Sequence, residues 1–406
     1  MGDPPLSGLR VLELGNFMAG PYCGLVLADL GADVIKVENP EGGDFSRASP
    51  PFAGGPGGES AGFLALNRNK RSLALDLKHP EGRALFLHLA ERADVVIENF
   101  RPGTMADLGL DDSCLRPRNP RLIYCSVSGY GQTGPYAHRP GLDLIIQGMS
   151  GLMSITGEPG RPPAKVGVPV ADLAAALFAA NAIQAALLAR ERTGRGQRID
   201  VSLFEAAVAL EVWETSSYFA TGDVPQPLGS AHRTGAPYQA FRTADGYITL
   251  GATTPRTWQA LCEALDRPDL AADPRFATNA QRKANEAALA QIIERITLEQ
   301  SSEYWYRRLE AAGVPCGVLQ TIDQVVHDLH LAARGFILDL PQSRLGMVRS
   351  TGSPIHLSET PIRLDHAGPS LGEHTAQILD ELGIPAAERA ALARAGVFGR
   401  PEQPAD

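Results

Sequence analysis

The chain has 406 residues, of which 44% are hydrophobic and 20% charged, a balance typical of a globular protein with a sizeable core. Its formal net charge is −9 and no long basic run occurs, which argues against a nucleic-acid partner. The first residues do not combine a basic start with an apolar stretch, and no run of about 18 apolar residues occurs. We therefore expect neither a signal peptide nor a membrane segment.

The cysteine and histidine patterns indicate neither a disulfide framework nor a metal site. The five cysteines form an odd count, and no two of them have the C-x-x-C spacing. The nine histidines include no H-E-x-x-H motif or similar paired spacing. Reduced thiols are typical of the cytoplasm, so we expect a cytoplasmic protein without a metal.

Apolar runs in the first third of the chain alternate with a helical pattern. The segments 9–14 and 34–38 read as strands that flank a helical stretch, all within about 30 residues, which is the size of one βαβ unit. Further strands are predicted at 73–77, 95–100 and 122–128, with a helix at 80–93 that begins at Pro80. Parallel strands joined by helices predict a doubly wound, Rossmann-like α/β domain.

A glycine motif follows the run at 122–128. Gly129, Gly131 and Gly134 have the spacing G-x-G-x-x-G of a dinucleotide-binding turn. That turn needs a helix to begin at the third glycine, whereas two prolines and a glycine lie within the next seven residues. The motif therefore predicts a glycine turn and not a nicotinamide-binding fingerprint.

Asp172 ends a second informative stretch. The residues KVGVPVAD, 165–172, read as a short buried strand, and an Ala/Leu-rich helix follows up to about residue 192. An aspartate at that junction is a favoured N-cap of the helix. A rigidly held carboxylate beside free backbone donors also suits a covalent nucleophile. The spacing alone does not separate these two interpretations.

Several motifs together resemble class III coenzyme A-transferases, the CaiB/BaiF family that includes formyl-CoA transferase. The resemblance covers almost the whole chain and is carried by LSGLRVLELGNFMAGPYCGLVLADLGADVIKVENPEGGD, NRNKRSLALDLKHPEG, VVIENFRPG, SGYGQTGP, SGLMSITGEP, VGVPVADL, RTGRGQRIDVSLFEA, PYQAFRTADGYITLGA and LGEHTAQIL. It implies that Asp172 is the nucleophile, with the capping role beside it. It also implies that acyl-CoA and a free carboxylic acid are the substrates, with no tightly bound cofactor.

The fold implied by the resemblance is a large Rossmann-like domain built from both chain ends, with a smaller α+β domain inserted between them. We expect the large domain at 1–221, a linker with a glycine-containing loop at 222–236, the small domain at 237–335 and a C-terminal return at 336–406. A hairpin formed by YQAFRT and YITLGA should open the small domain. Members of the family are interlocked homodimers.

The resemblance also assigns site residues. Lysine and arginine suit the phosphates of CoA, and apolar side chains suit its adenine. The expected CoA contacts are Phe17, Met18, Asn39, Leu75, Lys78, Asn99, Phe100 and Arg101. The expected active-site loop contains Gly229, His232, Arg233 and Gly235.

The substrate assignment follows from where the chain departs from formyl-CoA transferase. Met18, Asn39 and Asp107 occupy positions where that enzyme has other residues, which argues against formyl-CoA and oxalate. The segments SAHRTGAPYQAF and NRNKRS resemble succinyl-CoA:dicarboxylate transferases, including the glutarate enzymes. A second carboxylate needs a cation, and we expect Arg68, then Arg47, to supply a guanidinium fork.

Two other functions are less favoured. An α-methylacyl-CoA racemase of the same family needs a histidine before the aspartate of its G-H-D motif, and this chain has Leu142 there. Leucine carries no proton, so acid–base racemisation is disfavoured. A non-catalytic CoA-binding protein would lack the aspartate that this chain has at position 172.

Overall fold

The structure of the chain, a computed structural model, describes residues 2–399. It divides into two compact units, which are described separately. The large unit takes its described residues from 1–152, 166–216 and 330–406, and the small unit consists of 153–165 and 217–329. The predicted domain boundaries lie close to these, at 222 and 336, but the prediction did not separate 153–165 from the large domain.

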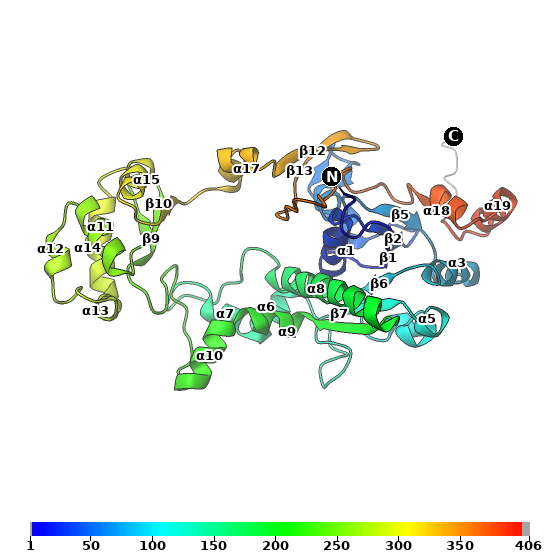
Figure 1. The fold of residues 1–406 in the computed structure, drawn as a ribbon, viewed down its shortest axis with the longest axis horizontal. Helices are drawn as coiled ribbons and strands as arrows, with labels where there is room; N and C mark the ends of the chain where they lie inside the picture. The colour runs from blue at the N-terminus through cyan, green and yellow to red at the C-terminus, as the bar shows by residue number, and fades with distance from the viewer. Residues whose placement is uncertain (1, 400–406) are drawn as a thin grey trace. The chain divides into compact units, whose positions relative to one another are not determined.

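The large unit is built on a six-stranded parallel sheet in the order β5-β2-β1-β6-β7-β8 (Figure 1). The strands are β1 (Arg10–Glu13), β2 (Asp33–Glu38), β5 (Arg71–Ala74), β6 (Val95–Glu98), β7 (Ile123–Ser128) and β8 (Arg198–Ser202). Numbered within the sheet alone, this order is 3-2-1-4-5-6, the strand order of the Rossmann fold. The chain reverses direction across the sheet between β1 and β6, and ligands of such folds bind at the carboxyl ends there.

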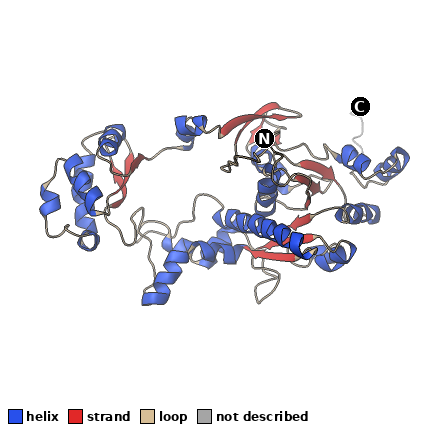
Figure 2. Ribbon diagram, in the orientation of Figure 1, coloured by secondary structure: helices blue, strands red, loops and turns tan. Residues whose placement is uncertain are grey.

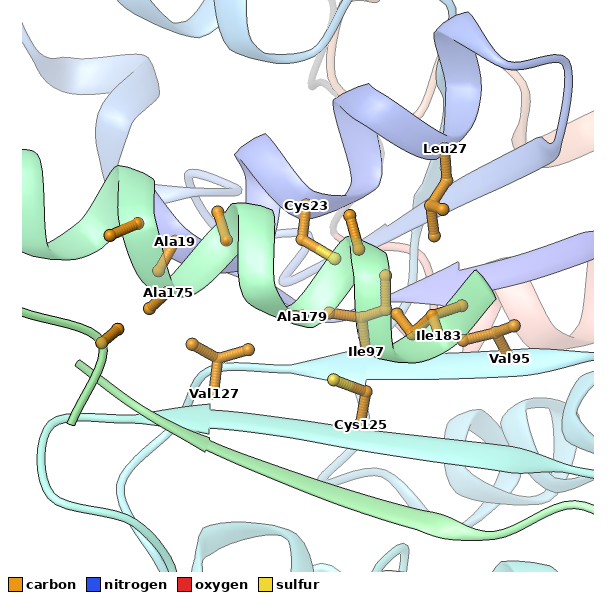
Figure 3. Close-up of a cluster of buried hydrophobic side chains, with 14 of the residues drawn as sticks. Ala19, Cys23, Leu27, Val95, Ile97, Cys125, Val127, Ala175, Ala179 and Ile183 are labelled. Atoms are coloured by element: carbon orange, nitrogen blue, oxygen red, sulfur yellow. The ribbon is translucent and has the colours of Figure 1, made fainter. Parts of the chain in front are cut away.

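Helices α1 (Ala19–Asp29) and α8 (Val170–Thr193) cover one face of the sheet. Figure 3 shows Ala19 and Cys23 of α1 and Ala175 and Ala179 of α8 above Ile97 and neighbouring side chains of β6 and β7. Among the buried alanines of α8, Ala171, Ala175 and Ala179 recur four residues apart, which places these three on one side of the helix. Their small side chains let α8 pack closely on both the sheet and α1.

The other face of the sheet is equally apolar. Along β1, Val11 belongs to the cluster under α1 and α8, whereas Leu12 belongs to the opposite cluster. This alternation is expected of a strand buried on both faces. Helices α3 (Pro80–Ala90), α5 (Asp112–Arg118) and α18 (Thr375–Glu381) contribute buried leucine, isoleucine and phenylalanine side chains to that second cluster. Figure 2, in the orientation of Figure 1, distinguishes the helices in blue from the strands in red.

The remaining elements of the large unit are short. Its other helices are α2 (Ala61–Leu66), α4 (Thr104–Asp107), α6 (Asp143–Ser150), α9 (Leu203–Leu210), α19 (Ala386–Arg394) and the 3₁₀ turn η1 (Phe45–Ala48). Two small hairpins pair β3 (Phe52–Ala53) with β4 (Glu59–Ser60) and β12 (Ile337–Gln342) with β13 (Gly346–Thr351). Helices α7 (Leu152–Ile155), α10 (Val212–Thr221) and α17 (Leu329–Ala333) stand where the chain passes from one unit to the other.

By length and composition alone, α8 could cross a membrane. It is the one such helix among the described residues, and 44% of its most apolar window is buried inside the protein. A core helix passes the same test, and α8 packs on α1 and the sheet. The expectation that the chain has no membrane segment stays a prediction.

The small unit is a three-stranded antiparallel sheet with helices. Its strands are β9 (Tyr238–Arg242), β10 (Tyr247–Gly251) and β11 (Cys316–Val318), in the order β11-β10-β9. Its helices are α11 (Pro255–Ala264), α12 (Asp269–Ala272), α13 (Asn279–Ala284), α14 (Glu286–Thr297), α15 (Ser302–Ala311) and α16 (Ile322–Val325). The predicted hairpin is confirmed as β9 and β10.

Two sequence predictions near the site need correction or completion. Residues 165–169 form no strand, because the neighbouring positions of β7 in the sheet are taken by β6 and by β8, a strand that the sequence analysis did not identify. The glycine motif behaves as predicted. No helix begins at Gly134, and the next helix, α6, starts at Asp143.

Candidate active site

A pocket of about 310 Å³ opens at the carboxyl ends of β1, β2, β5 and β6, where the chain reverses direction across the sheet. This is the expected ligand position in a Rossmann-like sheet, and the volume lies at the small end of the range for ligand pockets. The pocket is lined by Leu14, Gly15, Asn16, Val37, Glu38, Asn39, Gly43, Asp44, Phe45, Leu75, Asp76, Leu77, Lys78, Phe100, Thr104 and Leu108.

Four of the predicted CoA contacts line this pocket. They are Asn39, Leu75, Lys78 and Phe100. Leu75 is buried in the wall, Phe100 is half-buried, and the side chains of Asn39 and Lys78 are exposed at the opening. The arrangement offers apolar surface inside and a cation outside, as an adenosine with phosphates requires.

The other four predicted contacts lie beside the pocket in the chain and do not line it. Asn99 fastens the loop after β1, because its side chain accepts a hydrogen bond from the Asn16 backbone N–H (2.8 Å) and donates one to the Asn16 carbonyl (2.9 Å). Phe17 and Met18 follow on that loop, and Phe17 has a positive φ of 59°. Arg101 follows Phe100 and is exposed.

A buried group of charges underlies the loop. Lys36 Nζ lies 2.8 Å from Glu13 Oε1 and 2.9 Å from Asp44 Oδ2, and all three side chains are inaccessible. Burial opposes the ammonium, but Glu13 and Asp44 outweigh it and raise the pKa of Lys36. Asp44 also accepts a hydrogen bond of 3.0 Å from the Phe17 backbone N–H. This network therefore fixes the conformation of the loop beside the pocket.

Both arginines predicted to read a substrate carboxylate are already engaged in the protein. Arg68 is 5% exposed and forms a two-pronged ion pair with Asp29, and it also donates to the carbonyls of Thr351 and Gly352. Arg47 makes two 2.7 Å hydrogen bonds to Glu38. Each guanidinium already makes its two parallel hydrogen bonds to a protein carboxylate. The geometry therefore disfavours binding of a substrate carboxylate by either residue.

Asp172 lies in the first turn of α8, three residues after the cap position, which is held by Pro169. The prediction that Asp172 caps the helix is wrong for this geometry. The Ala171 backbone N–H, which a cap would satisfy, donates instead to Asp143 Oδ1 at 2.9 Å. Asp143 comes from α6 and was not singled out from the sequence, although it is the last residue of the G-L-D motif examined for Leu142.

The Asp172 carboxylate is half-buried, and it makes no hydrogen bond or ion pair with the described residues 2–399. Burial, and then the negative charge of Asp143, raise the pKa of Asp172 to about 7. A carboxylate with a raised pKa and free lone pairs is a better nucleophile than an ordinary, hydrogen-bonded one.

The predicted active-site loop belongs to the small unit and is fastened there. His232 Nδ1 accepts hydrogen bonds from the backbone N–H groups of Thr234 (3.2 Å) and Gly235 (3.1 Å). The Arg233 guanidinium donates to the Gln226 carbonyl at 3.2 Å. Gly229 has a φ of 61°, and a Cβ there would meet the Glu158 carboxylate at 2.7 Å.

The described residues hold no group of three or more His, Cys, Asp or Glu side chains that could bind a metal ion.

Comparison with known proteins identifies the family of the chain. The model of CoA-transferase family III matches residues 6–375. A succinate–glutarate CoA-transferase of Agrobacterium fabrum is 46% identical over 93% of this chain and 96% of its own length, and a succinyl-CoA:mesaconate CoA-transferase of Haloarcula hispanica is 42% identical over 93% and 96%. A CaiB/BaiF family crystal structure from Brucella suis superposes with a TM-score of 0.85 at 43% identity, over 94% of this chain and 100% of that one. The chain is a member of CoA-transferase family III.

Proposed function

We propose that this enzyme moves CoA from succinyl-CoA to a dicarboxylic acid through covalent intermediates on Asp172. The observation that carries the proposal is the half-buried Asp172 carboxylate, which has no partner in the described chain and has a pKa of about 7. The names of the relatives support the substrate class, since one is named for glutarate and one for mesaconate, both dicarboxylic acids.

The proposed reaction begins when an Asp172 carboxylate oxygen attacks the thioester carbonyl of the donor. The C–S bond breaks, and a mixed anhydride and the CoA thiolate form. The thiolate then attacks the Asp172 carbonyl carbon, which releases the donor acid and leaves an aspartyl-CoA thioester. The acceptor carboxylate attacks that thioester, and the same two steps run in reverse, so no cofactor is consumed.

We propose that CoA binds at the pocket beside the sheet. We expect Leu75 and Phe100 to contact the adenine and Lys78 to pair with a phosphate, because these residues supply apolar and cationic groups at one opening. Asn39 lines the same opening, and the exposed Arg101 follows Phe100 in the chain. The proposal assigns no residue to the second carboxylate of the acceptor, because Arg68 and Arg47 already bind Asp29 and Glu38.

We also propose that the chain works as an interlocked homodimer in the cytoplasm, as the family resemblance implies. Two helices expose large apolar side chains that a partner chain would cover. On α8 these are Leu177, Phe178 and Leu188, and on α10 they are Val212, Trp213, Tyr218 and Phe219. α10 buries none of its residues within the single chain. Exposed apolar surface of this kind marks interaction sites.

The test is Asp172→Ala, with the exposed Asp223→Ala as its control. Transfer from succinyl-CoA to glutarate should fall to background in the first variant and stay unchanged in the second. Hydroxylamine added during turnover should convert Asp172 of the wild type to a hydroxamate, found by mass spectrometry in the peptide 166–190. A folded Asp172→Ala enzyme that retains transfer, or labelling at another residue, would exclude this mechanism.

A further inference from the structure

Gln147 is a buried amide on α6, next in the chain to a residue of the large unit's apolar core. It is 0% exposed, and its neighbour Ile146 belongs to the core under α8. A buried amide costs folding free energy unless its donors and acceptor are satisfied, and an aliphatic side chain would fill the same space without that cost. The presence of a polar group here therefore calls for a physical reason.

The hydrogen bonds of Gln147 supply a physical reason for its burial. Its Oε1 accepts from the Val166 backbone N–H at 2.8 Å, and its Nε2 donates to Asp143 Oδ2 at 2.6 Å. Nε2 also lies 3.5 Å from the Val168 carbonyl oxygen. The two ends of the amide are distinguished by these partners, because a backbone N–H only donates and an ionised carboxylate only accepts.

The bonds converge on the segment that leads into α8. Residues 166–169 include Gly167 and Pro169 and belong to no strand, so no sheet ladder fixes them. Gln147 binds this segment at Val166 and Val168. It also orients Asp143, whose other oxygen receives the Ala171 N–H immediately before Asp172.

We infer that Gln147 is a positioning residue for the transfer reaction, which holds the backbone of 166–171 through Asp143, Val166 and Val168 so that the Asp172 carboxylate faces the thioester. The inference rests on the proposed function, in which Asp172 is the nucleophile. A displacement of a reacting group by about 1 Å costs up to about 100-fold in rate. Gln147 thus controls the chemical step without touching either substrate.

Two variants test the hydrogen-bond donor and the hydrogen-bond acceptor of the Gln147 amide. Gln147→Met keeps the length of the side chain and removes both hydrogen-bonding ends. Gln147→Glu keeps an acceptor for Val166 and sets a second carboxylate against Asp143, at the position of a 2.6 Å hydrogen bond. The control is Gln184→Met, the same change on α8. The Gln184 side chain is exposed and donates a hydrogen bond to the Ala180 carbonyl of its own helix at 3.1 Å.

Steady-state kinetics and hydrogen–deuterium exchange provide the readouts. We expect kcat to fall roughly 100-fold in Gln147→Met and further in Gln147→Glu, with KM for the acyl-CoA within about twofold of the wild type. Exchange in the peptide 166–173, measured without substrate, should become faster in both variants. Gln184→Met should match the wild type in both measurements.

The outcomes separate this inference from the proposed function. Unchanged exchange in Gln147→Met overturns the inference, and so does faster exchange with an unchanged kcat. A rise in KM with an unchanged kcat also overturns it, because that pattern assigns Gln147 to binding. If Asp172→Ala retains transfer, the proposed function fails, and the exchange measurement still decides whether Gln147 holds the segment.

Discussion

Replacement of Arg68 by alanine distinguishes a substrate-binding role from a structural one. The sequence predicts that Arg68 reads a dicarboxylate, whereas the structure shows its guanidinium bound to Asp29 at the end of α1. Arg68 Nη1 also donates to the Thr351 carbonyl at 3.0 Å, just at the end of β13. These contacts join α1, the segment before β5 and the C-terminal return of the large unit.

The magnitude follows from burial. Side-chain exposure is 6% for Arg68 and 3% for Asp29, so Arg68→Ala leaves a buried carboxylate with Asn69 Nδ2 as a remaining side-chain donor. Loss of one partner of a buried ion pair costs about 3–5 kcal/mol. In a unit of this size, that loss should lower the Tm by about 5–10 °C.

The assay compares thermal unfolding with transfer to a dicarboxylate and a monocarboxylate. At a temperature where the variant is folded, Arg68→Ala should leave the ratio of kcat/KM for glutarate and butyrate unchanged. The exposed Arg92→Ala should alter neither the Tm nor the ratio. A fall of 30-fold or about that size for glutarate alone, with the Tm unchanged, would refute the structural role and restore the one predicted from the sequence.

Three further results are expected. The transfer rate should rise with pH through about 7, because only the ionised Asp172 attacks and its pKa is raised to that value; a rate already constant between pH 5 and 8 would contradict the assignment. Phe100→Ala should raise KM for the acyl-CoA about tenfold with little change in kcat, since loss of base stacking costs about 1–3 kcal/mol; an unchanged KM would place CoA elsewhere. Lys36→Met should destabilise the fold by about 3–5 kcal/mol in chemical denaturation, because Asp44 loses its cation inside the protein. By contrast, Lys78→Met, on the exposed rim of the pocket, should weaken CoA binding and leave the stability unchanged.

The architecture was predictable from the sequence because it follows from local patterns. β1, β2, β6 and β7 are short apolar runs separated by helical or glycine-containing segments, and each lies where the pattern predicts it to within a few residues. β8 was not identified because its sequence RIDVS contains no apolar run like those of the other strands; its alternation of polar and apolar residues at the sheet edge is a strand pattern that the sequence analysis did not use. The segment before α8 has a β-like sequence, but the two positions beside β7 in the sheet are taken by β6 and β8.

The candidate site was predictable only in part, for a physical reason. The resemblance located Asp172, Leu75, Lys78 and Phe100 through motifs in the chain. It could not show that Arg68 and Arg47 pair with Asp29 and Glu38, because these partners are 39 and 9 residues away and meet only in the fold. Asp143 and Gln147 were missed for the same reason: their hydrogen bonds cross from α6 to the start of α8.

The pKa values of two carboxylates in this fold, Glu38 and Asp172, are shifted in opposite directions. Glu38 is more deeply buried than the half-buried Asp172, but two hydrogen bonds from Arg47 overcome the burial and lower the pKa of Glu38. Asp172 has a carboxylate neighbour in place of a guanidinium, and its pKa rises. Since its pKa in the folded state lies above the unfolded value, ionisation of Asp172 destabilises the fold as the pH rises from about 4 through about 7. A structural role gives no reason to accept that cost, whereas a nucleophile must keep its lone pairs free of other donors. The lack of a partner at Asp172 is therefore the feature that links the stability of this protein to its chemistry.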